Sequence, residues 1–296
     1  MKKIVILSGK GGVGKSSVVA SLAVLLARNR KIIAVDCDVD ASNLALVLGL
    51  RTDAFESWHP VQTSEKALLV PEKCTHCEKC KSVCNFNAIS WDEKKGEPIF
   101  NELLCEGCGA CQLVCDAGAI ELKKVDNAKV GFGRTKYGFY IVSGQLKMGE
   151  AGSGKVVSVV KDRAYELAKK EEAEIILIDS AAGIGCPVIA SVRDADYGVV
   201  VTEPTPSAFS DMKRALSVLN HFGIKYGIII NRYDINTKLT ETIEKFANEH
   251  DLPILGKIPY DRTFVDALVN LIPIVIYDKK YEKLFSEILA KIVNQL

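Results

Sequence analysis

The segment Gly9–Ser16, GKGGVGKS, constrains the fold more than any other stretch of the sequence. It fits the phosphate-loop pattern G-x-x-x-x-G-K-[ST]. The preceding residues Lys3–Leu7 are apolar and β-type, and the following residues place apolar side chains at helical spacing. The loop therefore joins a predicted strand to a predicted helix. A loop between a strand and a helix indicates a P-loop nucleotide-binding domain. A glycine-rich turn that binds no ligand would not require this strand and helix.

The residue types in this loop suit bound phosphate groups. Glycines let the backbone turn its N–H groups toward the phosphates, and the N-terminus of the following helix adds partial positive charge. We expect Lys15 to bind the β- and γ-phosphates and Ser16 to bind Mg²⁺. The predicted nucleotide-binding residues of the loop are Gly9, Gly11, Gly12, Val13, Gly14, Lys15, Ser16 and Ser17.

Alternating apolar strands and amphipathic helices fill most of the chain, which predicts an α/β fold with a mostly parallel, doubly wound sheet. The alternation stops near residue 60 and resumes after residue 125. We therefore predict one P-loop ATPase domain formed by residues 1–60 and 126–296, interrupted by an inserted domain at 61–125.

The insert contains eight of the ten cysteines, in two runs with the spacing C-x2-C-x2-C-x3-C. This is the spacing of bacterial two-cluster ferredoxins, and the two runs repeat with a period of 31 residues. Zinc is a weaker alternative, because zinc sites usually pair C-x2-C with a distant second pair. Thiols without metal are a third reading, and a disulfide framework does not suit a reducing cytosol. We predict two [4Fe–4S] clusters in a ferredoxin-like domain.

The spacing also assigns ligands, because the fourth cysteine of each run binds the cluster of the other run. The proline that usually follows that cysteine is replaced by Asn85 in the first run and Asp116 in the second. No fourth cysteine is missing, so a single cluster is not expected. The predicted ligands are Cys74, Cys77, Cys80 and Cys115 for cluster 1, and Cys105, Cys108, Cys111 and Cys84 for cluster 2.

Charge and hydropathy argue against two classes of partner. The chain has 38 basic and 37 acidic residues, a net charge of +1, which gives no support for binding to nucleic acid or an anionic membrane. No apolar run approaches the roughly 20 residues of a membrane span. The N-terminus lacks the features of a secretory signal. We expect a cytoplasmic protein whose amphipathic last helix packs on the sheet.

The segment Lys10–Ser16, KGGVGKS, resembles the deviant Walker A motif of the MinD/ParA/Mrp family, which is related to the nitrogenase iron protein. The resemblance implies that Lys10 acts across a dimer interface on the nucleotide held by the partner subunit. It therefore implies a homodimer that forms on ATP binding. An alternative reading makes Lys10 a solvated loop residue.

Two further segments are similar to the switch regions of that family. VDCDVDASNL, residues 35–44, resembles switch I, which implies Asp36 near Mg²⁺ and Asp38 orienting the attacking water. A turn or helix-capping role is the alternative for Asp38. IILIDSAAGIGCPVIAS, residues 175–191, resembles Walker B and switch II, although many relatives have proline within the sequence SAAG. There Asp179 would hold the water shell of Mg²⁺ and the Gly183 amide would sense the γ-phosphate.

The segment IIINRYD, residues 228–234, places Asn231 where the family has an adenine-contacting asparagine. The loop around Pro259 matches the base pocket only weakly. Cys37 and Cys186 are expected to be packing residues. Cys186 also lies seven residues after Asp179, where the nitrogenase iron protein carries a ligand of its intersubunit cluster, but no second ligand is evident here.

These features predict a Mg²⁺-dependent ATPase whose nucleotide switch acts on two [4Fe–4S] clusters. The favoured output is electron transfer to a partner metalloprotein, because eight ligands suit stable redox centres. The alternative is a carrier or assembly ATPase for iron–sulfur or other metal clusters. A spatial organiser like the partitioning ATPases is a weaker reading. A cobyrinate-type amide ligase would need a glutaminase domain for which the chain has no room.

Overall fold

The computed structural model describes residues 1–150 and 152–296, which form two compact units. Unit 1 comprises Met1–Trp58, Val130–Gln145 and Ser153–Leu296. Unit 2 comprises His59–Lys129 and also Leu146–Gly152. The short second segment of unit 2 lies within the range 126–296, which the sequence assigned to the ATPase domain.

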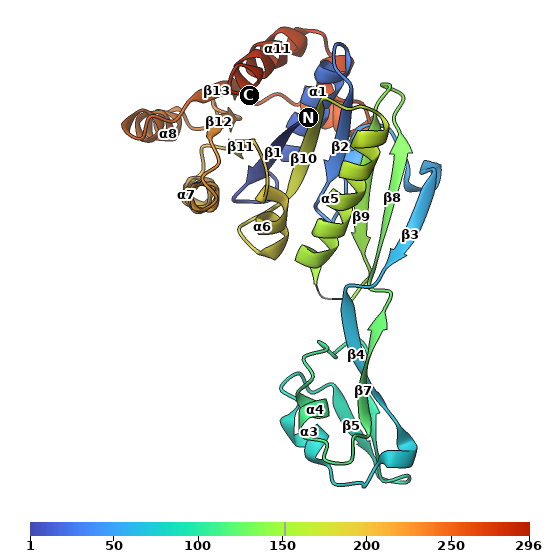
Figure 1. Ribbon diagram of the computed structural model, residues 1–296. Helices are drawn as coiled ribbons and strands as arrows, with labels where there is room; N and C mark the ends of the chain where they lie inside the picture. The colour runs from blue at the N-terminus through green and yellow to red at the C-terminus, as the bar shows by residue number, and fades with distance from the viewer. Residues whose placement is uncertain (151) are drawn as a thin grey trace. The chain divides into compact units, whose positions relative to one another are not determined.

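The sheet of unit 1 has nine strands in the order β13-β12-β11-β1-β10-β2-β9-β8-β3. Strand β1 pairs in parallel with both β10 and β11, and β10–β2, β2–β9, β11–β12 and β12–β13 are also parallel (Figure 1). This arrangement confirms the predicted α/β fold with a mostly parallel sheet. The strands are β1 (Lys2–Ser8), β2 (Ile32–Asp36), β3 (Ser57–Val61), β8 (Ala128–Arg134), β9 (Tyr140–Leu146), β10 (Ile175–Ala182), β11 (Tyr197–Thr202), β12 (Tyr226–Asn231) and β13 (Ile254–Ile258).

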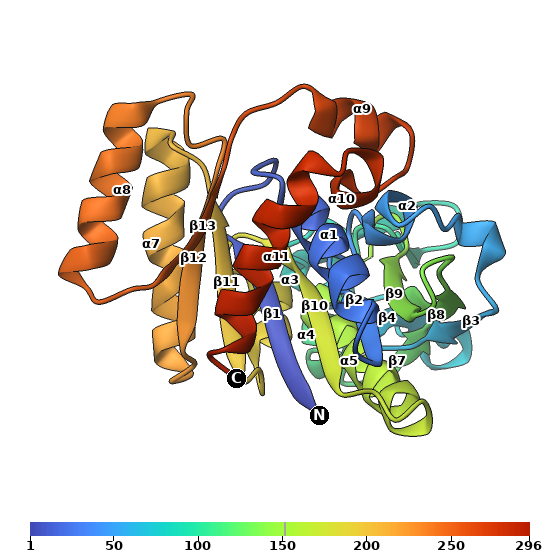
Figure 2. The ribbon, with the colours of Figure 1, turned by 90° about the horizontal axis from the view of Figure 1, so that it is seen from above.

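Both faces of the central strands are buried by helices. Ile4 and Ile6 of β1 belong to one core cluster with residues of α1 and α11, while the alternate residues Val5 and Leu7 are equally buried outside that cluster. Figure 2 shows α1 and α11 side by side. Helix α5 contacts β2, α6 contacts β10, and α7 contacts β11. The helices are α1 (Lys15–Ala27), α2 (Leu44–Val47), α5 (Ser153–Lys170), α6 (Cys186–Val192), α7 (Pro206–His221), α8 (Thr237–Glu249), α9 (Thr263–Val269), α10 (Ile274–Tyr277) and α11 (Lys280–Val293), with a 3₁₀ turn, η1, at Thr52–Ala54.

Unit 2 consists of two antiparallel strand pairs and two short helices. Strand β4 (Ser64–Leu69) pairs with β7 (Ile120–Val125), and β5 (Ile89–Asp92) pairs with β6 (Glu97–Phe100). A 3₁₀ turn, η2, covers Pro71–Lys73, and the helices are α3 (Lys79–Val83) and α4 (Ala110–Leu113). Cysteines take the place of larger apolar residues in the small core, which contains Ala67, Cys80, Ile89, Cys111 and Ile120.

The 31-residue sequence repeat is also present in the backbone of unit 2. Three pairs of positions separated by 31 residues have positive φ angles, namely His76 and Gly107, Glu78 and Gly109, and Asn87 and Gly118. Glu78 and Gly109 are the N-cap residues of α3 and α4. The first half thus adopts with ordinary side chains a left-handed conformation that the second half adopts with glycine. The two halves therefore share one fold.

Within the described residues, no helix is both long enough and apolar enough to span a membrane.

Candidate functional site

The loop between β1 and α1 opens into a cavity of about 600 Å³, the loop cavity. Helix α1 begins at Lys15, and Gly12 and Gly14 have φ angles of 82° and 88°, which favour glycine. The cavity lies at the carboxyl ends of the parallel strands, where ligands bind in open α/β sheets. Its predicted lining residues are Gly11, Gly12, Gly14, Lys15, Ser16, Ser17, Asp38 and Asn231. The other residues predicted to act here do not line it, namely Gly9, Lys10, Val13, Asp36, Asp179 and Gly183.

Gly9 instead allows close contact between the loop and α7. A Cβ atom at Gly9 would lie 2.1 Å from the backbone oxygen of Asp211, whereas one at Gly11 would meet only the Ala182 Cβ at 3.9 Å. Neither glycine has a positive φ angle, so space alone separates them. Gly9 therefore positions the loop by packing.

We predict that Gly9→Ala lowers the free energy of unfolding by about 1–3 kcal/mol, because backbone atoms must move to admit the methyl group. Gly11→Ala is the matched control and should leave stability unchanged or slightly higher. Urea unfolding followed by circular dichroism measures both. Equal stability of the two variants would contradict the packing role of Gly9.

A buried ion pair lies at the base of the loop cavity. Lys15 Nζ donates a hydrogen bond to Asp179 Oδ1, and both side chains are almost completely buried. Burial by itself would lower the pKa of Lys15, but the Asp179 carboxylate holds that pKa above its ordinary value. The other carboxylate oxygen, Asp179 Oδ2, is buried without a hydrogen-bond partner among the described residues. This oxygen, and the hydroxyl of Ser16 in the cavity lining, are hard oxygen ligands of the kind that Mg²⁺ prefers.

Asp36 shapes the segment that resembles switch I. Its Oδ1 accepts the Asp38 N–H at 3.1 Å and its Oδ2 accepts the Leu44 N–H at 3.0 Å. Burial, and then the Asp179 carboxylate, raise the pKa of Asp36 to about 8. Asp38 lines the loop cavity, and burial raises its pKa against the opposing effect of Lys15. Asp36 therefore holds the backbone that presents Asp38.

The Gly183 amide is used within the protein, because its N–H donates to the Ser8 carbonyl at 2.9 Å. Gly183 has a φ of 95°, which requires glycine in practice. The bond ties the segment that resembles switch II to the end of β1. Contact of this amide with a phosphate would require the Ser8 bond to open.

Lys10 lies outside the loop cavity and is 41% exposed. Its Nζ is 3.8 Å from Glu203 Oε1, and Arg232 pairs with the other oxygen of Glu203 at 2.9 Å. The ion pair between Lys10 and Glu203 is long, and it is weak because Arg232 already neutralises the Glu203 carboxylate. The ammonium group of Lys10 is therefore available at the surface.

Asn231 supports the phosphate loop directly. Its Nδ2 donates to the Val13 carbonyl at 2.7 Å, and its Oδ1 accepts the Arg232 N–H at 3.0 Å. The sequence predicted an adenine contact for Asn231 but not this hydrogen bond to the loop. It also missed most of the segment after Pro259, where α9 and its flanks supply apolar cavity walls. These residues are Tyr260, Phe264, Val265, Leu268 and Leu271.

The eight clustered cysteines separate into two small cavities of unit 2. The two runs do not map one to each cavity, because the fourth cysteine of each run lies with the first three of the other. Cysteine cavity 1 is lined by Cys74, Cys77, Cys80 and Cys115, and cysteine cavity 2 by Cys84, Cys105, Cys108 and Cys111.

Backbone N–H groups point at three of these sulfur atoms. The Ala88 N–H donates to Cys84 Sγ at 3.3 Å, and the Ala119 N–H donates to Cys115 Sγ at 3.2 Å. The Ala67 N–H donates to Cys105 Sγ at 3.5 Å. Such donors stabilise thiolates bound to metal. Across residues 1–150 and 152–296, no group of three or more His, Cys, Asp or Glu side chains could hold a metal ion. A cluster differs from a single ion, since its thiolates surround a cavity and do not converge on one point.

The remaining two cysteines lie in unit 1. Cys37 is completely buried, and burial raises the pKa of its thiol to about 12, so it is a packing residue. Cys186 is exposed at the start of α6.

Comparison with known proteins identifies the family. The profile of the CobQ/CobB/MinD/ParA nucleotide binding domain matches residues 4–274. The chain belongs to this family. The MinD/ParA members of this family are ATPases, so ATP binding and hydrolysis are the expected activity.

Relatives and solved structures agree with this assignment. An uncharacterized protein of Methanocaldococcus jannaschii is 35% identical over 98% of this chain and 96% of its own length. The iron-sulfur cluster carrier protein of Pyrococcus abyssi is 25% identical over 99% of this chain and 86% of its own length. The septum site-determining protein MinD of Pyrococcus horikoshii, complexed with Mg-ADP, superposes with a TM-score of 0.59 at 23% identity, covering 98% of this chain and 95% of that one. This structure shows the shared fold.

Proposed function

We propose that this protein is a Mg²⁺-dependent ATPase whose nucleotide state controls two [4Fe–4S] clusters that pass electrons to a partner metalloprotein. The observation that carries the proposal is the division of the eight cysteines into two sets of four. Each cavity combines three cysteines of one run with the fourth of the other, which is the ligand arrangement of two-cluster ferredoxins. The inserted domain, 61–125 in the sequence, therefore acts as a ferredoxin-like module.

At the loop cavity, ATP would place its phosphates against the loop amides and the Lys15 ammonium. Lys15 would exchange its bond with Asp179 for the β- and γ-phosphates, which would free the Asp179 carboxylate to hold Mg²⁺ together with the Ser16 hydroxyl. Asp38, held by the Asp36 carboxylate, orients the attacking water. When bound, Mg²⁺ would neutralise charge that develops on the phosphates.

The switch would be the Gly183 amide. In the structure this N–H binds the Ser8 carbonyl, and a γ-phosphate offers it a charged acceptor, which makes a stronger hydrogen bond. Exchange of the one acceptor for the other moves switch II toward the nucleotide. Loss of the γ-phosphate reverses the exchange, as in other nucleotide switches.

Dimer formation on ATP would use Lys10. Among the described residues its exposed ammonium has one long contact, so it can leave Glu203 and reach the nucleotide of the partner subunit at small cost. We predict that Lys10→Ala lowers ATP-dependent dimer formation at least tenfold and leaves binding of ADP by the monomer unchanged. Sedimentation with and without a non-hydrolysable ATP analogue measures the first, and calorimetric titration with ADP the second. Normal dimer formation by Lys10→Ala would exclude the cross-subunit role.

A cluster carrier or assembly ATPase is the second candidate, favoured by the similarity to the iron-sulfur cluster carrier protein of Pyrococcus abyssi. The complete set of eight cysteines favours retained redox centres. A spatial organiser is a third and weaker candidate, suggested by the similarity to MinD proteins. The net charge of +1 gives no electrostatic support for binding of the protein to a membrane or DNA.

One experiment separates these candidates. The protein is purified without oxygen and assayed for iron and sulfide. It is then incubated with a chelator, with an apo-ferredoxin, and with anionic vesicles or DNA. Retained clusters that cycle reversibly support the electron donor. Transfer of a cluster to the apo-ferredoxin favours the carrier, and co-sedimentation with vesicles or DNA favours the organiser. Capture from an anaerobic lysate with and without the ATP analogue then identifies the metalloprotein partner.

A further inference from the structure

The two cysteine cavities are built from equivalent residues of the 31-residue repeat. Their walls pair as Leu69 with Phe100, Trp91 with Leu122, Ala119 with Ala88, Ile120 with Ile89, and Pro98 with Ala67. The fold therefore gives the cavities the same backbone. Any difference between two bound clusters must come from the residues that break the repeat.

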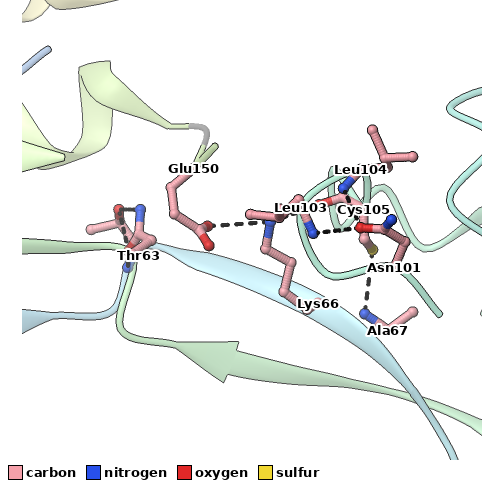
Figure 3. Close-up of polar contacts among 9 residues, drawn as sticks. Thr63, Lys66, Ala67, Asn101, Leu103, Leu104, Cys105 and Glu150 are labelled. Carbon is pink, nitrogen blue, oxygen red and sulfur yellow. Dashed lines mark hydrogen bonds and ion pairs between the residues drawn. The ribbon is translucent and has the colours of Figure 1, made fainter. Parts of the chain in front are cut away.

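The pair formed by Ala67 and Pro98 changes the hydrogen bonding to a ligand. The Ala67 N–H donates to Cys105 Sγ in cysteine cavity 2 (Figure 3). The equivalent contact in cysteine cavity 1 would join residue 98 to Cys74, but proline has no N–H to donate. The bonds to the fourth cysteines, by contrast, occur in both cavities, from Ala88 to Cys84 and from Ala119 to Cys115.

The preceding position changes the charge near the same ligand. Lys66 is only 3% exposed, and its Nζ donates to the Cys105 carbonyl at 2.9 Å. Glu150 lies beside it, with Oε2 at 3.2 Å from Lys66 Nζ (Figure 3). The equivalent of Lys66 in the other half is Glu97, which is partly exposed. The cation Lys66 thus lies against Cys105 of cysteine cavity 2, at a position where the other half of the repeat has the anion Glu97.

Two opposing charge effects must be weighed, positive charge near cysteine cavity 1 and negative charge near cysteine cavity 2, where the exposed Glu106 is part of the lining. Lys73, Lys79 and Lys81 lie in the first half, but their side chains are 53%, 54% and 44% exposed, so solvent and salt screen them. Glu150 offsets part of the buried charge of Lys66. Ala67 donates an N–H that Pro98 lacks, and this difference in hydrogen bonding does not depend on either charge effect. Burial of Lys66 also strengthens the Coulomb interactions of its ammonium group.

From these differences we propose that the two clusters have unequal reduction potentials, with the cluster in cysteine cavity 2 easier to reduce. Hydrogen bonds to the sulfur atoms and nearby positive charge stabilise the reduced, more negative form of a cluster. A single electron on the protein then resides in cysteine cavity 2. An electron that starts on cluster 1 would therefore move to cluster 2: cluster 1 would go from the 1+ to the 2+ state and cluster 2 from 2+ to 1+, without movement of a proton. The proposal rests on the two clusters of the proposed function.

Anaerobic redox titration with dithionite, followed by electron paramagnetic resonance, tests the proposal in the full chain. We expect two separate reduction steps. Lys66→Met should move only the step at higher potential, toward lower potential. Glu150→Gln should move the same step the opposite way, because it leaves the charge of Lys66 uncompensated. A purely structural role of the pair would not give opposite shifts.

Pro98→Ala is the complementary variant. It restores an N–H opposite Cys74 and should raise the step at lower potential, so that the two steps approach each other. Lys123→Met is the matched control, since Lys123 is exposed directly opposite Lys66 in the β4–β7 ladder and loses the same charge. It should move neither step.

Iron and sulfide analysis distinguishes a failure of the proposed function from a failure of the unequal potentials. A wild-type protein without two clusters per chain would refute the proposed function. Two clusters that reduce in one step would refute the unequal potentials, and a Lys66→Met shift confined to the step at lower potential would refute their proposed order; neither result would refute the proposed function. Where Lys66→Met lowers the iron content, the wild-type and Pro98→Ala titrations decide.

Discussion

Replacing Lys15 by alanine is expected to lower ATP turnover by about 10²–10³-fold, the effect of removing one preorganised charged donor from a reacting phosphate or oxyanion. Lys15 is the cation buried at the base of the loop cavity, and its pKa is held above the ordinary value by Asp179, so it is charged at neutral pH. No other lysine lines the loop cavity within the described residues. Phosphate release measures turnover, and a fluorescent ATP analogue measures binding.

Loss of folding must be separated from loss of chemistry in this test. Lys15→Ala leaves Asp179 buried without its partner, which costs about 3–5 kcal/mol. The double variant Lys15→Ala/Asp179→Asn removes that unpaired charge and should regain stability but not turnover. Lys238→Ala, an exposed lysine of α8, is the control for charge and should keep full turnover. Substantial turnover by a folded Lys15→Ala protein would contradict the role given to Lys15.

Cys84→Ser is expected to remove the cluster of cysteine cavity 2, about half of the iron, although Cys84 belongs to the first run. The cluster of cysteine cavity 1 keeps its four thiolates. Cys108→Ser should therefore have the same effect as Cys84→Ser, and Cys77→Ser should remove the other half. Iron and sulfide analysis of anaerobically purified protein measures each loss.

Double variants make the crossed arrangement testable. Cys84→Ser combined with Cys108→Ser should lose no more iron than either change alone, because both act on one cavity. Cys84→Ser combined with Cys77→Ser should lose nearly all of it, because changes at independent sites add. The reverse pattern would mean that each run binds its own cluster.

The sequence predicted those parts of the protein that depend on local spacing. The phosphate loop, the strand and helix on either side of it, and the parallel sheet all follow from Gly9–Ser16 and the alternation of apolar segments. The crossed cysteine sets followed from the spacing of the two runs alone. In each of these cases the residues that act together lie close in sequence or repeat at a fixed interval.

Contacts between distant segments could not be predicted in the same way. The bond from Asn231 to the Val13 carbonyl joins residues far apart in the chain, and the sequence suggested only a base contact. The apolar wall from α9 has no motif. Lys66 and Glu150 meet because Leu146–Gly152 belongs to unit 2, a segment that the α/β alternation assigned elsewhere. Burial turned two ordinary charged residues into a specific pair.

The strand pairing of unit 2 has a consequence for how its two halves fold. The first half contributes β4 and β5, which do not pair with each other, and the second contributes β6 and β7, which also do not. Each ladder and each set of four cysteines is completed only by the opposite half. One half alone would have no partner for either of its strands, and its set of three cysteines would lack the fourth thiolate. The two halves must therefore fold together, and loss of either half removes both ladders and both sets of thiolates. Because each half occupies a fixed place in this exchange, equivalent positions can differ, as Ala67 and Pro98 do.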